Sequence, residues 1–268
     1  MDTNKTFLHQ QGAAALPPSY SSAPPAFRTT FGSLSLHEMD KLRLIQFSSA
    51  DISMVRETIK RVWSSGIQAE RTYSVSHEFK LRGTPWTTYD RGTNAVQSMI
   101  LMREIFASLY SAGWILTAST DISRKISDKD TLLFRKQPVP PPTATWVTIS
   151  FKSDDKLRFL GAPPELLNAF ASTFSSNRVL RSHAAKDSAA NYYQFNLMGY
   201  PWRAHGEDTM RARLLILQMV ELLETHGWSL YASIDQKSST SDSSYGETDV
   251  WYCIKSADWV PGSIVLHH

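Results

Sequence analysis

Apolar and polar residues alternate along residues 31–36 and 41–47, and the short segment 37–40 joins the two runs. This pattern predicts a β-hairpin. Apolar residues at helical spacing follow to about residue 63, and a strand is then expected to end at residues 79–81. A longer helix is predicted over residues 93–112, with Gly113 as its C-cap glycine, followed by strands at 114–120 and 132–135.

The second half of the chain repeats this pattern. Residues 146–151 and 156–160 match 31–36 and 41–45 at an offset of 146 − 31 = 115. The pattern Phe-x-Leu-x-Gly-x-Pro-Trp occurs at 79–86 and again at 195–202, and Gly-Trp-x-Leu-x-Ala-Ser-x-Asp occurs at 113–121 and 227–235. A fifth match pairs Asp130 and the strand after it with Asp249 and residues 250–255. Five such matches in the same order indicate a tandem duplication.

The predicted fold class is α+β, with two ββαβαββ units and mostly antiparallel sheets. Both long helices, 93–112 and 208–226, are apolar around most of their circumference. We therefore expect each to contact its own sheet and the other repeat, which gives an intramolecular pseudo-dimer. The expected boundaries are a disordered Pro/Ser-rich tail (1–30), repeat A (31–137), a Pro-rich linker (138–145), repeat B (146–256) and a C-terminal tail (257–268).

Composition narrows the function only slightly. The chain of 268 residues has a formal net charge of +3, which makes RNA or an anionic lipid a weak third expectation for its ligand. The single cysteine, Cys253, fits a reducing compartment, and no apolar stretch of 18 residues predicts a membrane span. We expect a cytoplasmic or nuclear protein.

Catalytic and cofactor motifs are absent, including Gly-x-Ser-x-Gly, His-Glu-x-x-His and the phosphate loop. This absence disfavours an enzyme, and we expect neither a cofactor nor a metal. A convergent active site needs no motif, so a small-molecule site or an enzyme site between the two repeats stays as the alternative.

Three sets of residues are candidates for binding. Trp86 and Trp202, in the repeated Gly-x-Pro-Trp element, could stack on a ligand, although a core-filling role is favoured. Residues from two loops could bind an anion, or could belong to a solvated surface: Arg82, Arg124, Lys125 and Lys129.

The third set lies in the N-terminal tail. Pro17, Pro18 and Tyr20 form a Pro-Pro-x-Tyr segment that resembles the ligands of WW domains. The resemblance covers four residues and implies a WW-domain partner, such as a HECT-type ubiquitin ligase. The function expected first is therefore a non-catalytic protein-binding adaptor or scaffold.

Overall fold

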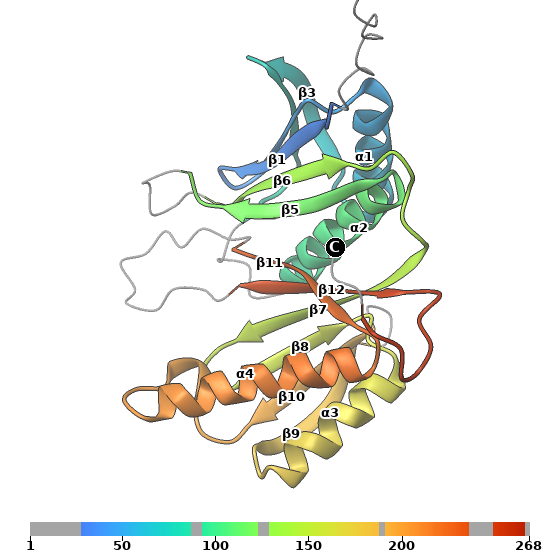
Figure 1. The fold of residues 1–268 in the computed structure, drawn as a ribbon. Coiled ribbons are helices and arrows are strands. Elements are labelled where there is room, and N and C mark those ends of the chain that lie inside the picture. The colour runs from blue at the N-terminus through green and yellow to red at the C-terminus, as the bar shows by residue number, and fades with distance from the viewer. Residues whose placement is uncertain (1–27, 87–92, 123–128, 188–190, 236–248, 266–268) are drawn as a thin grey trace, which may run out of the picture.

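The structure is a computed structural model that describes residues 28–86, 93–122, 129–187, 191–235 and 249–265 (Figure 1). Repeat A contains β1 (Phe31–His37), β2 (Lys41–Ile45), α1 (Ser49–Val62), β3 (Ile67–Tyr73), β4 (Ser76–Leu81), α2 (Thr93–Ser111), β5 (Trp114–Thr120) and β6 (Thr131–Lys136). Repeat B contains β7 (Ala144–Lys152), β8 (Lys156–Leu160), α3 (Pro164–Ser176), β9 (Leu180–Asp187), β10 (Tyr192–Leu197), the short 3₁₀ helix η1 (Pro201–Arg203), α4 (Asp208–Thr225), β11 (Ser229–Ile234) and β12 (Val250–Ser256).

The two repeats have the same topology. Sheet A has the strand order β3-β4-β2-β1-β6-β5, and sheet B has the corresponding order β9-β10-β8-β7-β12-β11. All pairings between neighbouring strands of the described chain are antiparallel. The predicted duplication, α+β class and antiparallel sheets are confirmed. β7 begins at Ala144, inside the segment expected to be linker.

Each repeat has one strand more than the predicted ββαβαββ order, so the observed order is ββαββαββ. The missed strands are β3 and β9, which lie at the outer edge of their sheets. Nearly all of their side chains are exposed, and neither sequence alternates apolar with polar residues. Backbone pairing with β4 and β10 holds these strands in place, and such pairing leaves no hydrophobic pattern in the sequence.

Local signals fix the helix ends as predicted. The Ser48 side chain accepts a hydrogen bond from the Asp51 N–H, and the Asp51 carboxylate accepts one from the Ser48 N–H, which forms a capping box at the start of α1. Gly113 and Gly227 follow α2 and α4 with φ of +83° each. This left-handed conformation suits glycine and ends both long helices.

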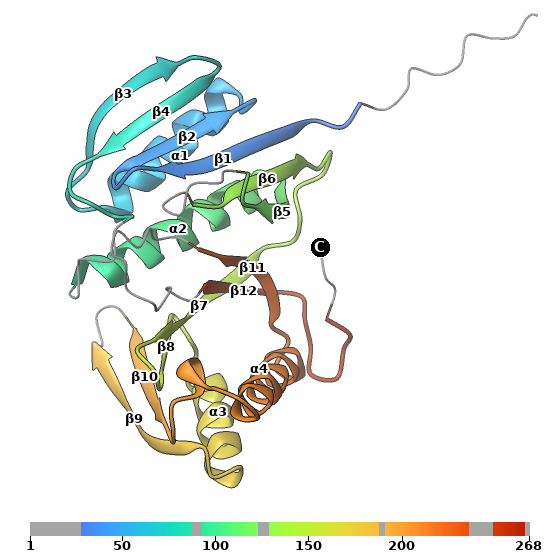
Figure 2. The same cartoon turned by 90° about the vertical axis from the view of Figure 1, so that its left-hand side faces the viewer.

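The two repeats stack head to tail in four layers: sheet A, then α1 and α2, then sheet B, then α3 and α4 (Figures 1 and 2). Phe106 of α2 contacts Tyr252 of sheet B with ring centroids 5.0 Å apart, and Tyr110 contacts Trp146 at 5.7 Å. Helix α2 therefore lies between the two sheets, as expected. Within the described residues, helix α4 packs on sheet B and on α3 of its own repeat, so the same expectation is wrong for α4.

Candidate functional site

The outer face of α4 is an exposed apolar stripe. Met210, Leu214 and Leu217 are exposed by 60%, 55% and 59% of their surface. Their spacing of four and then three residues places them on one side of the helix. The opposite side of α4 is buried on sheet B through Leu215, Met219 and Leu223. Exposed apolar residues are common singly, so three in one row make this face of α4 a candidate interaction surface.

Helix α2 shows what such a face binds. With Gly113 and Gly227 aligned, the offset between the helices is 227 − 113 = 114, so Arg103 of α2 corresponds to Leu217 of α4. Arg103 faces sheet B, since its guanidinium donates a hydrogen bond of 3.4 Å to the Leu160 carbonyl. At this helix position, sheet B therefore covers α2, whereas α4 is exposed.

The exposed charges of α4 are mostly positive in its first half and negative in its second half. Arg211 and Arg213 are exposed in the first half, and Glu221 is exposed in the second half, with Glu224 half-buried near it. Local contacts hold the arginines: Arg211 pairs with Asp208 at 3.1 Å, and Arg213 donates to the Thr209 carbonyl at 3.0 Å. A partner with the opposite charge order would complement this face.

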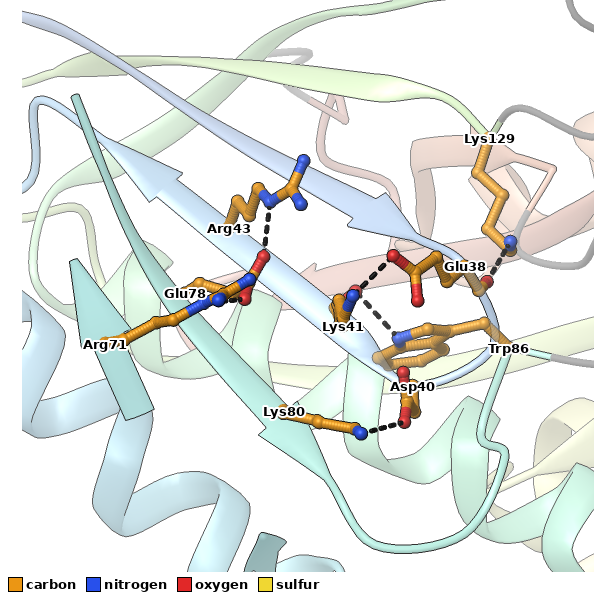
Figure 3. Close-up of polar contacts among 9 residues, drawn as sticks. All are labelled: Glu38, Asp40, Lys41, Arg43, Arg71, Glu78, Lys80, Trp86 and Lys129. Atoms are coloured by element: carbon orange, nitrogen blue, oxygen red, sulfur yellow. Dashed lines mark hydrogen bonds and ion pairs between the residues drawn. The ribbon is translucent and has the colours of Figure 1, made fainter. Parts of the chain in front are cut away.

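The outer face of sheet A differs because it carries a cluster of paired charges (Figure 3). Glu78 on β4 is only 2% exposed, and each of its oxygens accepts a hydrogen bond of 2.7 Å, one from Arg43 and one from Arg71. Burial raises the pKa of Glu78, but the two guanidinium groups outweigh this effect and hold it below its usual value. The Arg43 guanidinium also lies 4.1 Å from the ring centroid of Tyr73.

Two predicted binding residues have structural roles beside this cluster (Figure 3). Trp86 is fully buried and its indole N–H donates to the Lys41 carbonyl at 3.1 Å, so its ring has no exposed face for a ligand. Lys129, a candidate for anion binding in a loop that could also be simply solvated, is buried and donates to the Glu38 carbonyl at 2.6 Å. The stacking role of Trp86 and the exposed-loop role of Lys129 are therefore wrong.

The other predicted residues do not gather into one site. Trp202 is partly exposed, donates to the Lys156 carbonyl at 3.0 Å and packs edge-on against Phe151. Arg82 is exposed, and its carbonyl accepts a hydrogen bond from the Trp63 indole. The remaining candidates lie outside the described residues: Pro17, Pro18, Tyr20, Arg124 and Lys125.

Repeat B contains a buried arginine that the sequence analysis missed. Arg158 is only 9% exposed, and its Nε atom has no hydrogen-bond partner within the described chain. It pairs across the strands with Gln194, as Arg43 pairs with Glu78 in repeat A. The acid of repeat A is thus an amide in repeat B. Aligning the two repeats at this position would have shown in the sequence that Arg158 lacks an acidic partner. Burial lowers the pKa of Arg158, and Tyr192 partly offsets the effect.

A pocket of about 280 Å³ lies where the two repeats and the C-terminal segment meet. Tyr110 of α2, Ile254 of β12 and the C-terminal Trp259 and Ile264 form its mainly apolar wall. The Trp259 indole N–H donates to the Ser263 carbonyl at 3.1 Å, which fixes the fold of this segment. Such a pocket suits a small apolar group.

Ionisable groups in the described ranges offer little for metal or acid–base chemistry. No three His, Cys, Asp or Glu side chains there are arranged to hold a metal ion. Asp130 and Asp249 accept hydrogen bonds from Ser119 and Ser233, at 2.8 and 2.7 Å, and so join neighbouring strands. Burial raises the pKa of the Cys253 thiol to about 12, which disfavours the reactive thiolate.

The described residues form two copies of one α+β domain, and the outer face of α4 is exposed there. One family model, which covers a single domain, matches the chain twice, at residues 30–135 and 145–254. The chain belongs to this domain family and contains two copies of the domain.

Other comparisons add no function. A comparison with the curated proteins finds no match. Among solved structures, the chain is similar to a conserved kinetoplastid-specific protein from Trypanosoma cruzi at 16% identity and a TM-score of 0.30, over 41% of this chain and 100% of that one. That description states no ligand, partner or reaction. No helix within the described ranges has the length and hydrophobicity needed to cross a membrane.

Proposed function

We propose that this protein is a non-catalytic protein-binding scaffold that binds a partner through the outer face of α4. The exposed row of Met210, Leu214 and Leu217 carries the proposal. The equivalent side of α2 is covered by sheet B, so the domain already uses this helix face for binding inside the chain.

The N-terminal tail supplies a second contact in this proposal. Pro17, Pro18 and Tyr20 match the Pro-Pro-x-Tyr ligand of WW domains. A scaffold with a short linear motif and a folded binding face can join two proteins at one place. We place this function in the cytoplasm or nucleus, where a single reduced cysteine is usual.

Affinity capture of the intact protein from its native lysate, followed by reconstitution from purified components, tests the proposal. Leu217→Arg should lower retention of a stoichiometric partner at least ~10-fold, because a charge would replace one of the three apolar side chains of the row. Ser53→Arg, exposed on α1, adds the same charge elsewhere and should leave retention unchanged. Tyr20→Ala tests the tail contact separately. Equal retention by Leu217→Arg and the unmodified protein would refute the role of α4.

A second function is favoured by the pocket between the repeats. Its volume of about 280 Å³ and its apolar wall suit a small apolar molecule or an apolar group of a larger one. Native mass spectrometry of the purified protein would detect a co-purifying molecule. Loss of that molecule in Ile254→Trp, with normal folding, would favour this function over the scaffold.

A further inference from the structure

We propose that the partner of α4 is the α4 helix of a second molecule of this chain, packed antiparallel about a twofold axis near Leu217. This inference rests on the proposed function, since it names the occupant of the same face. Leu214 and Leu217 of each molecule would form the apolar centre, and Met210 would lie at its edge.

The order of charges along α4 favours this antiparallel pairing. Arg213 lies four residues before Leu217 and Glu221 four residues after it (217 − 213 = 4; 221 − 217 = 4), or about 6 Å either way along the helix. A twofold axis at Leu217 therefore brings Arg213 of each molecule close to the second molecule's Glu221, with Glu224 one turn beyond. Parallel pairing would instead place arginine beside arginine and glutamate beside glutamate.

Continued head-to-tail stacking is the other arrangement of two molecules, with α4 of one on sheet A of the next. The outer face of sheet A is poorly suited to receive a helix. Ile254 of β12, which faces α2, corresponds at an offset of 119 to the charged Arg135 of β6, although Tyr252 corresponds to the apolar Leu133. The Arg43–Glu78–Arg71 cluster covers another part of that face. Sheet A thus ends the stack, as a polar capping repeat does.

The expected dimer is weak and reversible. A single pair of 18-residue helices buries less than the ~800 Å² per partner of a standard protein interface. We therefore expect a dissociation constant of about 1–100 µM for the intact chain. Such a dimer would present two N-terminal tails, which increases the avidity for a partner that contains two WW domains.

Charge reversal tests this geometry in sedimentation velocity experiments on the intact protein at up to about 200 µM, above the expected dissociation constant. Arg213→Glu should weaken the dimer at least ~10-fold, because acids of both molecules then face one another twice. The double variant Glu221→Arg/Glu224→Arg should weaken it similarly. An equimolar mixture of the two variants should form a heterodimer, because every pair in it is again opposite in charge. Unchanged circular dichroism controls for folding.

Restored association in the mixture supports the proposal, because other binding modes do not predict it. Two results would overturn it: a protein that stays monomeric at about 200 µM, or a mixture that stays as weak as its components. If the protein is monomeric but captures another protein, and Leu217→Arg abolishes that capture, this inference is overturned and the proposed function stands. A monomer with no such loss would remove both.

Discussion

Gln194→Glu should stabilise the protein, because it restores to repeat B the acid that repeat A has. Arg158 is 9% exposed with an unpaired Nε, and Gln194 is its cross-strand neighbour. In repeat A the same register gives an Arg43–Glu78 hydrogen bond of 2.7 Å. A charge-assisted hydrogen bond contributes about 1.5–3 kcal/mol.

Two costs reduce this gain. The new carboxylate loses some hydration, and it no longer donates to the Asn196 side chain, a bond of 2.8 Å in the present protein. The Tyr192 hydroxyl, which donates to Gln194 at 2.9 Å, can still donate to a carboxylate. We subtract about 1 kcal/mol for the lost bond and the desolvation, and expect a net gain of about 0.5–2 kcal/mol.

Thermal and denaturant unfolding measure this gain. For a chain of this size, 1 kcal/mol shifts Tm by about 2–4 °C, so Tm should rise by about 1–8 °C at pH 7. Gln68→Glu, exposed on β3, adds the same charge as a control and should change stability by less than about 0.5 kcal/mol. An unchanged or lower midpoint for Gln194→Glu would show that Arg158 is not an uncompensated buried charge.

Three further predictions follow from single residues. Trp86→Phe should lower the free energy of unfolding in denaturant by about 2–4 kcal/mol, because it removes a buried hydrogen bond and leaves a cavity. Trp202→Phe should lower it by about half as much, because Trp202 is partly exposed. The native pKa of Glu78 lies below the ordinary 4.5, so the stability that ionised Glu78 contributes is present above pH 4.5 and is lost as the pH falls through the native pKa. In Glu78→Gln, the free energy of unfolding measured from pH 3 to 7 should therefore fall less at acid pH than in the unmodified protein. Gly227→Ala should lower Tm by at least ~4 °C, because φ is +83° and a Cβ atom would lie 2.3 Å from the Trp259 ring; an unchanged Tm would contradict the placement of that ring.

Much of the fold could be predicted from the sequence because the repeated elements bury apolar faces. Leu34, Leu42 and Phe79 occupy the core of sheet A, and their counterparts Ile149, Leu157 and Phe195 are buried in repeat B. Strands β3 and β9 could not be predicted, since they are exposed edge strands held by backbone pairing. Hydrophobic periodicity does not report such strands.

The relation between the repeats could be predicted only in part. Both long helices are apolar around most of their circumference, but for different reasons. Helix α2 is covered by sheet B on its second apolar side, whereas α4 leaves Leu214 and Leu217 exposed. Sequence alone does not separate a second buried face from an exposed one. The burial of Lys129 was equally hidden, because its acceptor is the Glu38 carbonyl, 91 residues away in the chain.

Photo-crosslinking at position 217 tests most directly whether the outer face of α4 binds protein. The intact chain would carry p-benzoylphenylalanine in place of Leu217, or in place of Ser53 on α1 as a control, in its native lysate. We predict a protein adduct at position 217, of the mass of two chains for self-association, and none at position 53. The absence of any protein adduct at position 217 would contradict α4 as an interaction surface.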